Sequence, residues 1–219
     1  MSPALGRKWI IALDGPAAAG KGTLARKLAA HFNLATLDTG AIYRAVARKV
    51  IELGADPGDP RAAMGAAASL TAEDLQAPGL REEAVSRGSS VVAAIPAVRR
   101  QLIEFQRRFA KNPPGNVHGA LLDGRDIGTV ICPEADVKIF LTASLEARAE
   151  RRFQELRRAG QDPIKARVLE DMRARDGRDA SRATAPLKAA PGAFELDTTG
   201  LDEDQVFARV LDHIGQKLR

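Results

Sequence analysis

A short glycine-rich segment near the start of the chain has the residue types and spacing of a phosphate-binding loop. It consists of Asp14, Gly15, Pro16, Ala17, Ala18, Ala19, Gly20, Lys21, Gly22 and Thr23. The apolar run Trp9–Leu13 precedes it and a helical pattern over Lys21–Phe32 follows it, which is the context that the pattern Gly-x4-Gly-Lys requires. Glycines let backbone N–H groups point at phosphate oxygens, and the following helix directs its positive end at the same anion. We therefore predict that residues 15–23 bind a phosphate chain.

Lys21 is predicted to reach the β- and γ-phosphates of a nucleoside triphosphate as a point charge. In the strict pattern a Ser or Thr follows the lysine directly, whereas here Gly22 intervenes before Thr23. Thr23 is nevertheless the candidate hydroxyl for a magnesium ion. The chain contains no Asn-Lys-x-Asp sequence, the base-recognition motif of GTPases, so a GTPase is excluded.

Acidic and basic side chains also follow later apolar runs. Asp38 and Asp123 each end such a run, and Arg44 and Arg125 come soon after them. The planar forks of arginines pair with phosphate oxygens two at a time, so Arg44, Arg125 and Arg182 together could hold one phosphate monoester. Asp123 is expected to orient the water ligands of a magnesium ion.

These residues are predicted to meet at one edge of a parallel sheet. Apolar runs at Trp9–Leu13, Leu34–Leu37, Ala120–Leu122, Val137–Leu141 and Phe194–Leu196 are typical of buried strands. Amphipathic stretches at Lys21–Phe32, Ile42–Leu53, Pro96–Ala110, Leu145–Ala159, Ile164–Arg175 and Asp204–Lys217 alternate with them. Strands that alternate with helices predict an α/β fold with helices on both faces. Ligands in such folds bind beyond the carboxyl ends of the strands.

The composition of the chain excludes several kinds of site and classes of protein. The chain has 219 residues, a formal net charge of +5, three histidines and the single cysteine Cys132, which excludes an internal disulfide and a structural zinc site. No apolar run is long enough to span a bilayer, and the first residues do not resemble a signal peptide. We therefore expect a soluble cytoplasmic protein. Its excess of Lys and Arg over Asp and Glu indicates an anionic partner.

Four motifs together resemble those of the bacterial cytidylate kinase family. They are Asp14-Gly15-Pro16 with Gly20-Lys21-Gly22-Thr23, Leu37-Asp38-Thr39-Gly40-Ala41-Ile42-Tyr43-Arg44, Leu122-Asp123-Gly124-Arg125-Asp126-Ile127-Gly128-Thr129 and Arg175-Asp176-Gly177-Arg178-Asp179-Ala180-Ser181-Arg182, in the same order as in that family. The resemblance extends from about Ile10 to Leu211. It implies a P-loop nucleoside monophosphate kinase fold, with a five-stranded parallel sheet, a small acceptor-binding insertion and a helical lid. The implied core covers about 8–53, 112–150 and 183–219, the acceptor lobe about 54–111 and the lid about 151–182.

The resemblance also implies an activity: transfer of the γ-phosphoryl group of ATP to CMP and dCMP with Mg²⁺, by a monomer that needs neither nucleic acid nor a membrane. It assigns catalysis to Lys21, Asp123, Arg125 and Arg182. The donor nucleotide would contact residues 15–23 and Arg157, with Thr23 and, through water, Asp123 at the metal. Acceptor binding is implied for Thr39, Arg44, Ser90, Arg99, Arg125, Asp126, Arg175, Arg178, Asp179 and Arg182, among which Ser90, Arg99 and Asp126 match the residues that recognise cytosine.

One segment departs from the family. The stretch from about Gly54 to Ser90 has small apolar residues and no strand-like alternation, so we expect a small helical insertion in place of the family's inserted β-sheet. Two other functions stay open. One is a related kinase with another acceptor, such as AMP or UMP. The other is a nucleic-acid-binding protein, although aromatic residues for base stacking are only 4% of the chain.

Overall fold

The computed structural model describes residues 8–71, 73–181 and 185–217. Five parallel strands form one sheet in the order β2-β3-β1-β4-β5. Their bounds are β1 Trp9–Asp14, β2 Leu34–Asp38, β3 Gly119–Gly124, β4 Val137–Thr142 and β5 Phe194–Asp197. The predicted five-stranded parallel sheet is therefore confirmed, and each strand lies where an apolar run predicted it.

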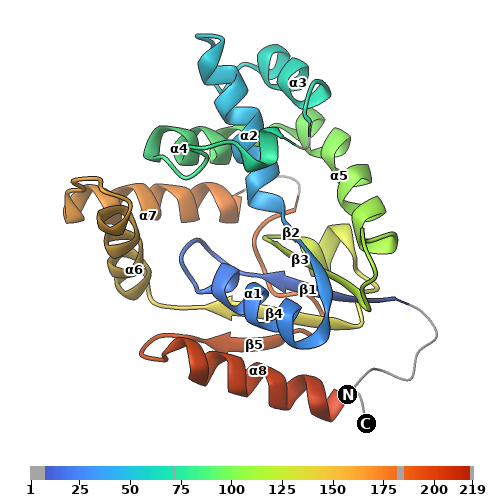
Figure 1. Cartoon of the computed structure of the whole chain (residues 1–219). Helices are drawn as coiled ribbons and strands as arrows, with labels where there is room; N and C mark the ends of the chain where they lie inside the picture. The colour runs from blue at the N-terminus through green and yellow to red at the C-terminus, as the bar shows by residue number, and fades with distance from the viewer. Residues whose placement is uncertain (1–7, 72, 182–184, 218–219) are drawn as a thin grey trace.

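The α-helices lie on both faces of this sheet and above its carboxyl edge (Figure 1). They are α1 Lys21–Phe32, α2 Thr39–Glu52, α3 Pro60–Ala68, α4 Glu83–Val92, α5 Pro96–Lys111, α6 Leu145–Arg158, α7 Lys165–Ser181 and α8 Glu203–Lys217. A 3₁₀ turn, η1, covers Asp74–Gln76, and a π-helix, η2, covers Ile127–Ile131.

The alternation of side chains along β1 divides the core into two layers. Ile11 and Leu13 pack with residues of α1 and α8 on one face of the sheet. Ile10 and Ala12 pack with residues of α2, α3 and α5 on the other face. Since β1 is buried at every position, the central strand is held from both sides, and the loop that follows it starts from a rigid support.

Two groups of helices project beyond the carboxyl edge of the sheet (Figure 1). The first contains α3, η1 and α4, which follow α2, and the described residues of this segment form helices and turns but no strand. The expected helical insertion is thus confirmed. The second is the pair α6 and α7, which has a small core of its own that contains Leu156, Val168 and Met172.

Two local elements differ from the sequence prediction. The second lid helix was predicted to end at Arg175, but α7 continues to Ser181. Asp176 and Asp179, on either side of Gly177, pair with arginines of neighbouring elements, which offsets the cost of a glycine in a helix. The π-helix η2 was not predicted. Such helices are rare and frequently lie at functional sites, and this one begins directly after Asp126.

Candidate active site

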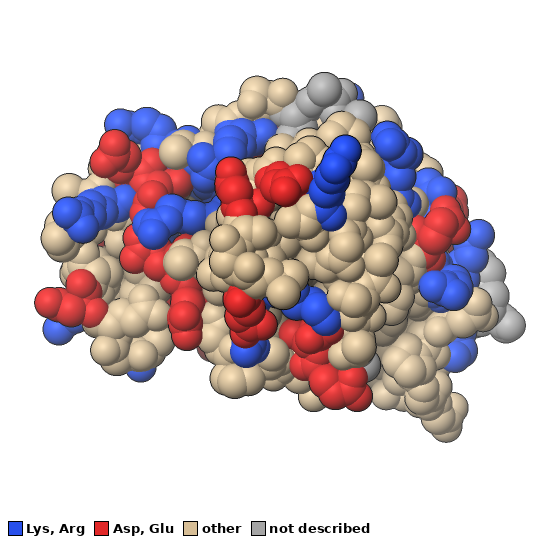
Figure 2. All heavy atoms as spheres, turned by 90° about the horizontal axis from the view of Figure 1, so that it is seen from above, with Lys and Arg blue, Asp and Glu red and all other residues tan. Residues whose placement is uncertain are grey.

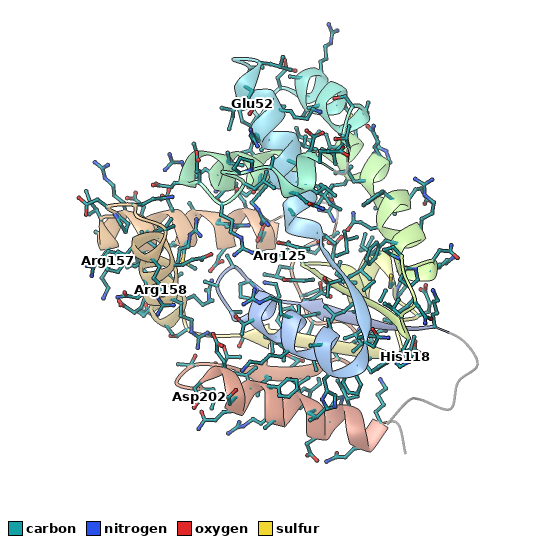
Figure 3. All side chains as sticks on the ribbon, viewed as in Figure 1. Glu52, His118, Arg125, Arg157, Arg158 and Asp202 are labelled. Atoms are coloured by element: carbon teal, nitrogen blue, oxygen red, sulfur yellow. The ribbon has the colours of Figure 1, made fainter. Side chains whose placement is uncertain are left out.

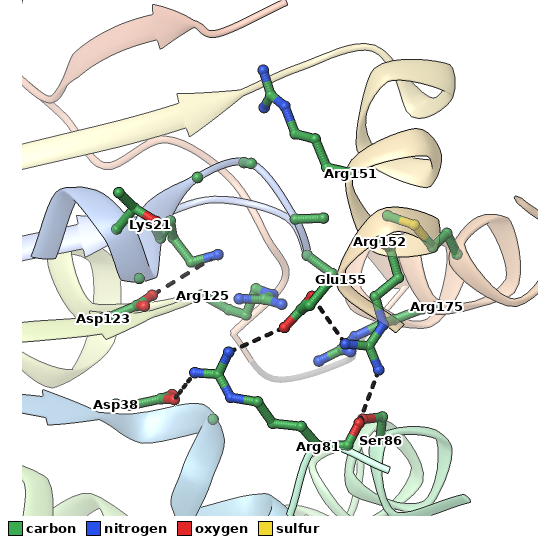
Figure 4. A pocket seen from close by; sticks show the side chains of 18 of the residues that line it. Lys21, Asp38, Arg81, Ser86, Asp123, Arg125, Arg151, Arg152, Glu155 and Arg175 are labelled. Atoms are coloured by element: carbon green, nitrogen blue, oxygen red, sulfur yellow. Dashed lines mark hydrogen bonds and ion pairs between the residues drawn. The ribbon is translucent and has the colours of Figure 1, made fainter. Parts of the chain in front are cut away.

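A cavity of about 830 Å³ lies between the phosphate-binding loop, the strand ends and the two projecting groups of helices. Figure 4 gives a close view of it, with side chains from the core, from the segment before α4 and from α6 and α7 that point toward one another. Eleven of the described lining residues are arginines. A concave site with so many cations suits a ligand that carries several negative charges.

The phosphate-binding loop needs glycine at its first position. Gly15 has φ 146°, and a Cβ atom built there would lie 2.1 Å from the carbonyl oxygen of Leu141 on β4. Any side chain would therefore push the loop away from the neighbouring strand. Gly20, at the N-cap of α1, has φ 93°, a conformation that glycine adopts without strain. These two glycines shape the loop around an anion at the N-terminus of α1.

Lys21 points from this loop toward the end of β3 (Figure 4). Its Nζ donates to the carbonyl oxygen of Pro16 at 2.8 Å and lies 3.9 Å from Oδ1 of Asp123. Burial and the nearby cation of Arg125 lower the pKa of Lys21 to about 7, whereas burial raises the pKa of Asp123. Phosphate oxygens would supply the negative charge that stabilises the protonated form of Lys21.

The end of β2 and the start of α2 position a second cation. Asp38 caps α2 by accepting from the backbone N–H of Ala41 at 3.1 Å, and its other oxygen accepts from Nη2 of Arg44 at 2.6 Å. Burial opposes the charged form of Asp38, but Arg44 and Arg81 outweigh it and hold the pKa of Asp38 below its usual value. Nε of Arg44 is buried and finds no partner among the described residues, so it is available to a ligand.

Thr39 and Gly124 bring β2 and β3 together at the edge of the sheet. The Thr39 hydroxyl donates to the carbonyl oxygen of Asp123 at 2.8 Å. A Cβ atom on Gly124 would lie 2.7 Å from that hydroxyl oxygen, so only glycine permits this approach. The contact fixes the start of α2, and therefore Arg44, relative to Asp123.

Arg125 and Arg175 approach the same point from β3 and α7. Nε of Arg125 donates to Oδ2 of Asp179 at 3.0 Å, so the core is tied to the lid. Nε of Arg175 is buried and has no partner among the residues described. Burial and the like charge of Arg125 lower the pKa of Arg175 to about 9. Two cations held together with one unpaired donor make a strong anion site.

Arg99 and Asp126 form a buried ion pair at the other end of the cavity. Arg99 also donates to the carbonyl oxygen of Ala93 at 3.3 Å, and its guanidinium lies 5.8 Å from the centre of the Tyr43 ring. An arginine that donates and a carboxylate that accepts, with an aromatic ring beside them, can recognise the edge of a heterocyclic base.

Comparisons with known proteins decide the family. The family model for cytidylate kinase matches residues 11–216. Two similar relatives are the cytidylate kinase of Paramagnetospirillum magneticum, 57% identical over 95% of this chain and 98% of its own, and that of Methylocella silvestris, 59% identical over 92% of each. The chain belongs to the cytidylate kinase family. A solved structure of an uncharacterized protein from Eubacterium ventriosum, with 15% identity and a TM-score of 0.53 over 95% of this chain and 99% of that one, shares the fold.

Most residues that the cytidylate kinase resemblance named do meet at the cavity. Those that line it are Ala17, Ala18, Ala19, Gly20, Lys21, Gly22, Thr23, Thr39, Arg44, Ser90, Arg99, Asp123, Arg125, Asp126, Arg175, Arg178 and Asp179. Gly15 and Pro16 belong to the same loop but do not line the cavity. Ser90 on α4 accepts from Nε of Arg178 on α7 at 3.0 Å, which joins the lobe to the lid.

Two further predicted residues are not part of this group. Arg157 is exposed on α6, lies 5.9 Å from the centre of the Phe153 ring and is absent from the described lining; Figure 3 shows it on the outer side of the lid. The arginines of α6 that do line the cavity are Arg151, Arg152 and Arg158. Arg182 lies outside the described residues.

Sequence reasoning missed a contact across the cavity mouth. Nη1 of Arg81, before α4, donates to Oε1 of Glu155 on α6 at 3.1 Å, and Nη1 of Arg152 donates to the other oxygen at 3.0 Å. Arg81 also lies 4.0 Å from Asp38. Figure 4 shows Glu155 between the arginines. No local pattern could have signalled a pair 74 positions apart.

The residues near Lys21 fit a magnesium ion that arrives with phosphates. Thr23 offers a hydroxyl and Asp123 a carboxylate, both at the cavity wall, and oxygen is the ligand type that Mg²⁺ prefers. Among the described residues no cluster of three acidic, His or Cys side chains could hold a metal by itself. A magnesium ion bound here would need phosphate oxygens and water to complete its ligands.

Proposed function

We propose that this chain transfers the γ-phosphoryl group of ATP to CMP, and also to dCMP, and releases ADP and the nucleoside diphosphate. The observation that carries the proposal is one cavity with a triphosphate loop at one end and the Arg99–Asp126 pair at the other. Family membership and the names of its relatives support the same reaction.

The reaction needs alignment and charge neutralisation more than a general base. An oxygen of the CMP phosphate forms a bond to the γ-phosphorus while the bond from that phosphorus to the β–γ bridging oxygen breaks, and ADP leaves with the electron pair. A phosphate monoester has a second pKa near 6 and is already mostly ionised at pH 7, so no histidine is required. Lys21, Arg125 and Arg175 would stabilise the charge on the transferring group.

We assign the donor to residues 15–23 and the acceptor to Thr39, Arg44, Ser90, Arg99, Asp126, Arg178 and Asp179. Thr23, and Asp123 through water, would hold Mg²⁺, which neutralises phosphate charge when bound. Arg125 and Arg175 would contact both phosphate groups. We retain Arg182 as an acceptor and catalytic residue from its motif alone. We withdraw Arg157 in favour of Arg151, Arg152 and Arg158, because those three line the cavity.

Domain roles follow from this assignment. Residues of about 8–53, 112–150 and 183–219 would form the core, about 54–111 the acceptor lobe and about 151–182 the lid. We propose that the protein acts in the cytoplasm as a monomer without nucleic acid. Basic and acidic side chains are mixed on the face seen in Figure 2, and surface arginines pair with acids, such as Arg48 with Glu52. Within the described residues, no helix is long and apolar enough to cross a membrane.

The test is an ADP-release assay with ATP, Mg²⁺ and one acceptor at a time. CMP and dCMP should support turnover, whereas UMP and AMP should support much less. A chain that prefers AMP or UMP would be a kinase for another acceptor. ADP release that does not depend on any nucleoside monophosphate would contradict the proposal, and a steep salt dependence of RNA binding would then favour a nucleic-acid-binding protein.

A further inference from the structure

Asp14 connects the two ends of the cavity. It is the last residue of β1, directly before the phosphate-binding loop, and its side chain is buried. Its Oδ1 accepts from the backbone N–H of Ile127 and its Oδ2 from that of Gly128, both at 2.8 Å. These two N–H groups belong to the first turn of η2, where the helix itself provides no acceptor for them.

The element that Asp14 holds carries the acceptor residues. Arg125 and Asp126 come directly before η2, and the carbonyl oxygen of Asp126 accepts from Val130 and Ile131 at 2.9 and 3.1 Å. A shift of η2 would therefore move Asp126, and with it the buried pair that Asp126 forms with Arg99. Asp14 has no place on the cavity wall, so it acts only through these neighbours.

We infer that Asp14 is a positioning residue that fixes the acceptor site relative to the donor loop. This inference rests on the proposed function. Asp14 is covalently continuous with the loop assigned to ATP and hydrogen-bonded to the helix that follows the residues assigned to CMP. In-line transfer depends on the distance between the two substrates, and a misplacement of about 1 Å can lower the rate about 100-fold.

The inference predicts a specific kinetic signature. A displaced η2 would carry Asp126 and its partner Arg99 together, so the binding of CMP alone, like that of ATP alone, should remain almost unchanged. The alignment of the two ligands for phosphoryl transfer should become less accurate. A bisubstrate analogue, in which adenosine and cytidine are joined through five phosphates, spans both half-sites and therefore reports their separation directly.

The experiment uses Asp14→Asn, which keeps the shape but turns one acceptor oxygen into an NH₂ donor that faces a backbone N–H. Asp14→Ser is the second variant, because it removes the buried carboxyl altogether. The matched control is Asp136→Asn. Asp136 also accepts a backbone N–H of β1, from Ile10 at 2.8 Å, but Ile10 lies about 13 Å further from the site along the strand.

We expect kcat to fall about 10- to 100-fold in the folded Asp14 variants, with the KM for ATP and for CMP within about threefold of the parent value. The bisubstrate analogue should bind at least about tenfold more weakly, and Asp136→Asn should match the parent in both readouts. Three results would overturn the inference. The Asp14 variants could keep the parental kcat and the parental affinity for the analogue, or they could show only a change in the KM for one substrate. Asp136→Asn could also lose as much kcat as the Asp14 variants do. A parent that does not phosphorylate CMP overturns the proposed function and this inference with it, whereas an active parent with unaffected variants overturns this inference alone.

Discussion

Nζ of Lys21 lies 3.9 Å from Oδ1 of Asp123, at the point where the phosphate-binding loop meets the end of β3. The lysine also donates to the loop carbonyl of Pro16. It is therefore held in place before a ligand arrives, with its charge directed at the position expected for the β- and γ-phosphates. This arrangement supports the proposal that Lys21 contributes strongly to transfer.

Lys21→Ala should lower kcat by ~10²–10³, the usual effect of removing one preorganised charge stabiliser from a shielded site. The fold should survive, because the loop backbone is unchanged. Steady-state kinetics with CMP would measure the effect. Lys27→Ala is the matched control, since Lys27 lies on the same helix but pairs with Asp204 on the surface. Near-normal turnover in Lys21→Ala would show that this loop does not act on ATP during transfer.

Arg175→Met should separate stability from activity. Because Nε of Arg175 is buried without a partner among the described residues, its removal should raise the melting temperature of the free protein by about 2–4 °C for each kcal/mol gained. The same change should lower kcat/KM for CMP about 10- to 100-fold, since one phosphate donor is lost. Thermal unfolding and kinetics test both parts, with the exposed Arg173→Met as control. A variant that is both less stable and fully active would refute the anion-site assignment.

The stability of the chain should depend on pH through Asp14. Burial raises the pKa of Asp14 to about 7, while the N–H groups of Gly128 and Ile127 oppose the shift; the nearby Asp126 raises it further and Lys21 lowers it. An acid whose pKa is higher in the folded than in the unfolded state takes up a proton on folding between the two values. As the pH rises from about 4 to about 7, the free energy of unfolding of the parent should therefore fall relative to that of Asp14→Asn. The fall should reach at most about 1.4 kcal/mol per pH unit.

Urea unfolding of both proteins at several pH values would measure this difference. The difference should be largest at the acidic end of the range and constant above about pH 7. Parallel stability curves for the parent and Asp14→Asn would mean that Asp14 has the same pKa in the folded and unfolded chains.

The segment 155–165 should become ordered when both substrates bind. It contains exposed residues on either side of Gly160 and connects α6 to α7. Its first residue, Glu155, accepts from Arg81 across the cavity mouth and from Arg152 on its own helix. Phosphates that enter the cavity would compete with this carboxylate for the arginines. Hydrogen exchange of this segment should slow with ATP and CMP together more than with either alone. Equal exchange in all states would contradict closure of the lid.

Local patterns predicted the sheet and the loop because their causes are local. Apolar runs marked the strands, and the glycines and Lys21 of the loop lie within a few positions of one another. The continuation of α7 past Gly177 could not be predicted, because it depends on distant partners: Asp176 pairs with Arg148, and Asp179 with Arg125. The same holds for η2, whose first N–H groups are satisfied by a carboxylate 113 positions earlier in the chain.

The candidate site residues show the same difference between features with local causes and features that depend on distant partners. Most of those that stand in short motifs were predicted and do line the cavity. Arg99, which the family resemblance supplied, and Asp126 line it as well, although their mutual pairing was not foreseen. Arg81 and Glu155 were missed, since a charged residue in an amphipathic stretch looks the same whether it faces solvent or a ligand. Arg157 was chosen by its position on α6, but Arg151, Arg152 and Arg158 of that helix line the cavity instead.

The buried pair of Arg99 and Asp126 provides the most direct test of the account. Cytosine offers an amino donor where uracil offers a carbonyl oxygen, and an ionised carboxylate only accepts. The measurement is the ratio of kcat/KM for CMP to that for UMP, in the parent and in Asp126→Asn. We predict that kcat/KM for CMP falls about 10- to 1,000-fold in the variant, that UMP loses much less, and that the ratio collapses. An unchanged ratio, with both acceptors equally affected, would mean that Asp126 only holds Arg99 in place and does not recognise the base.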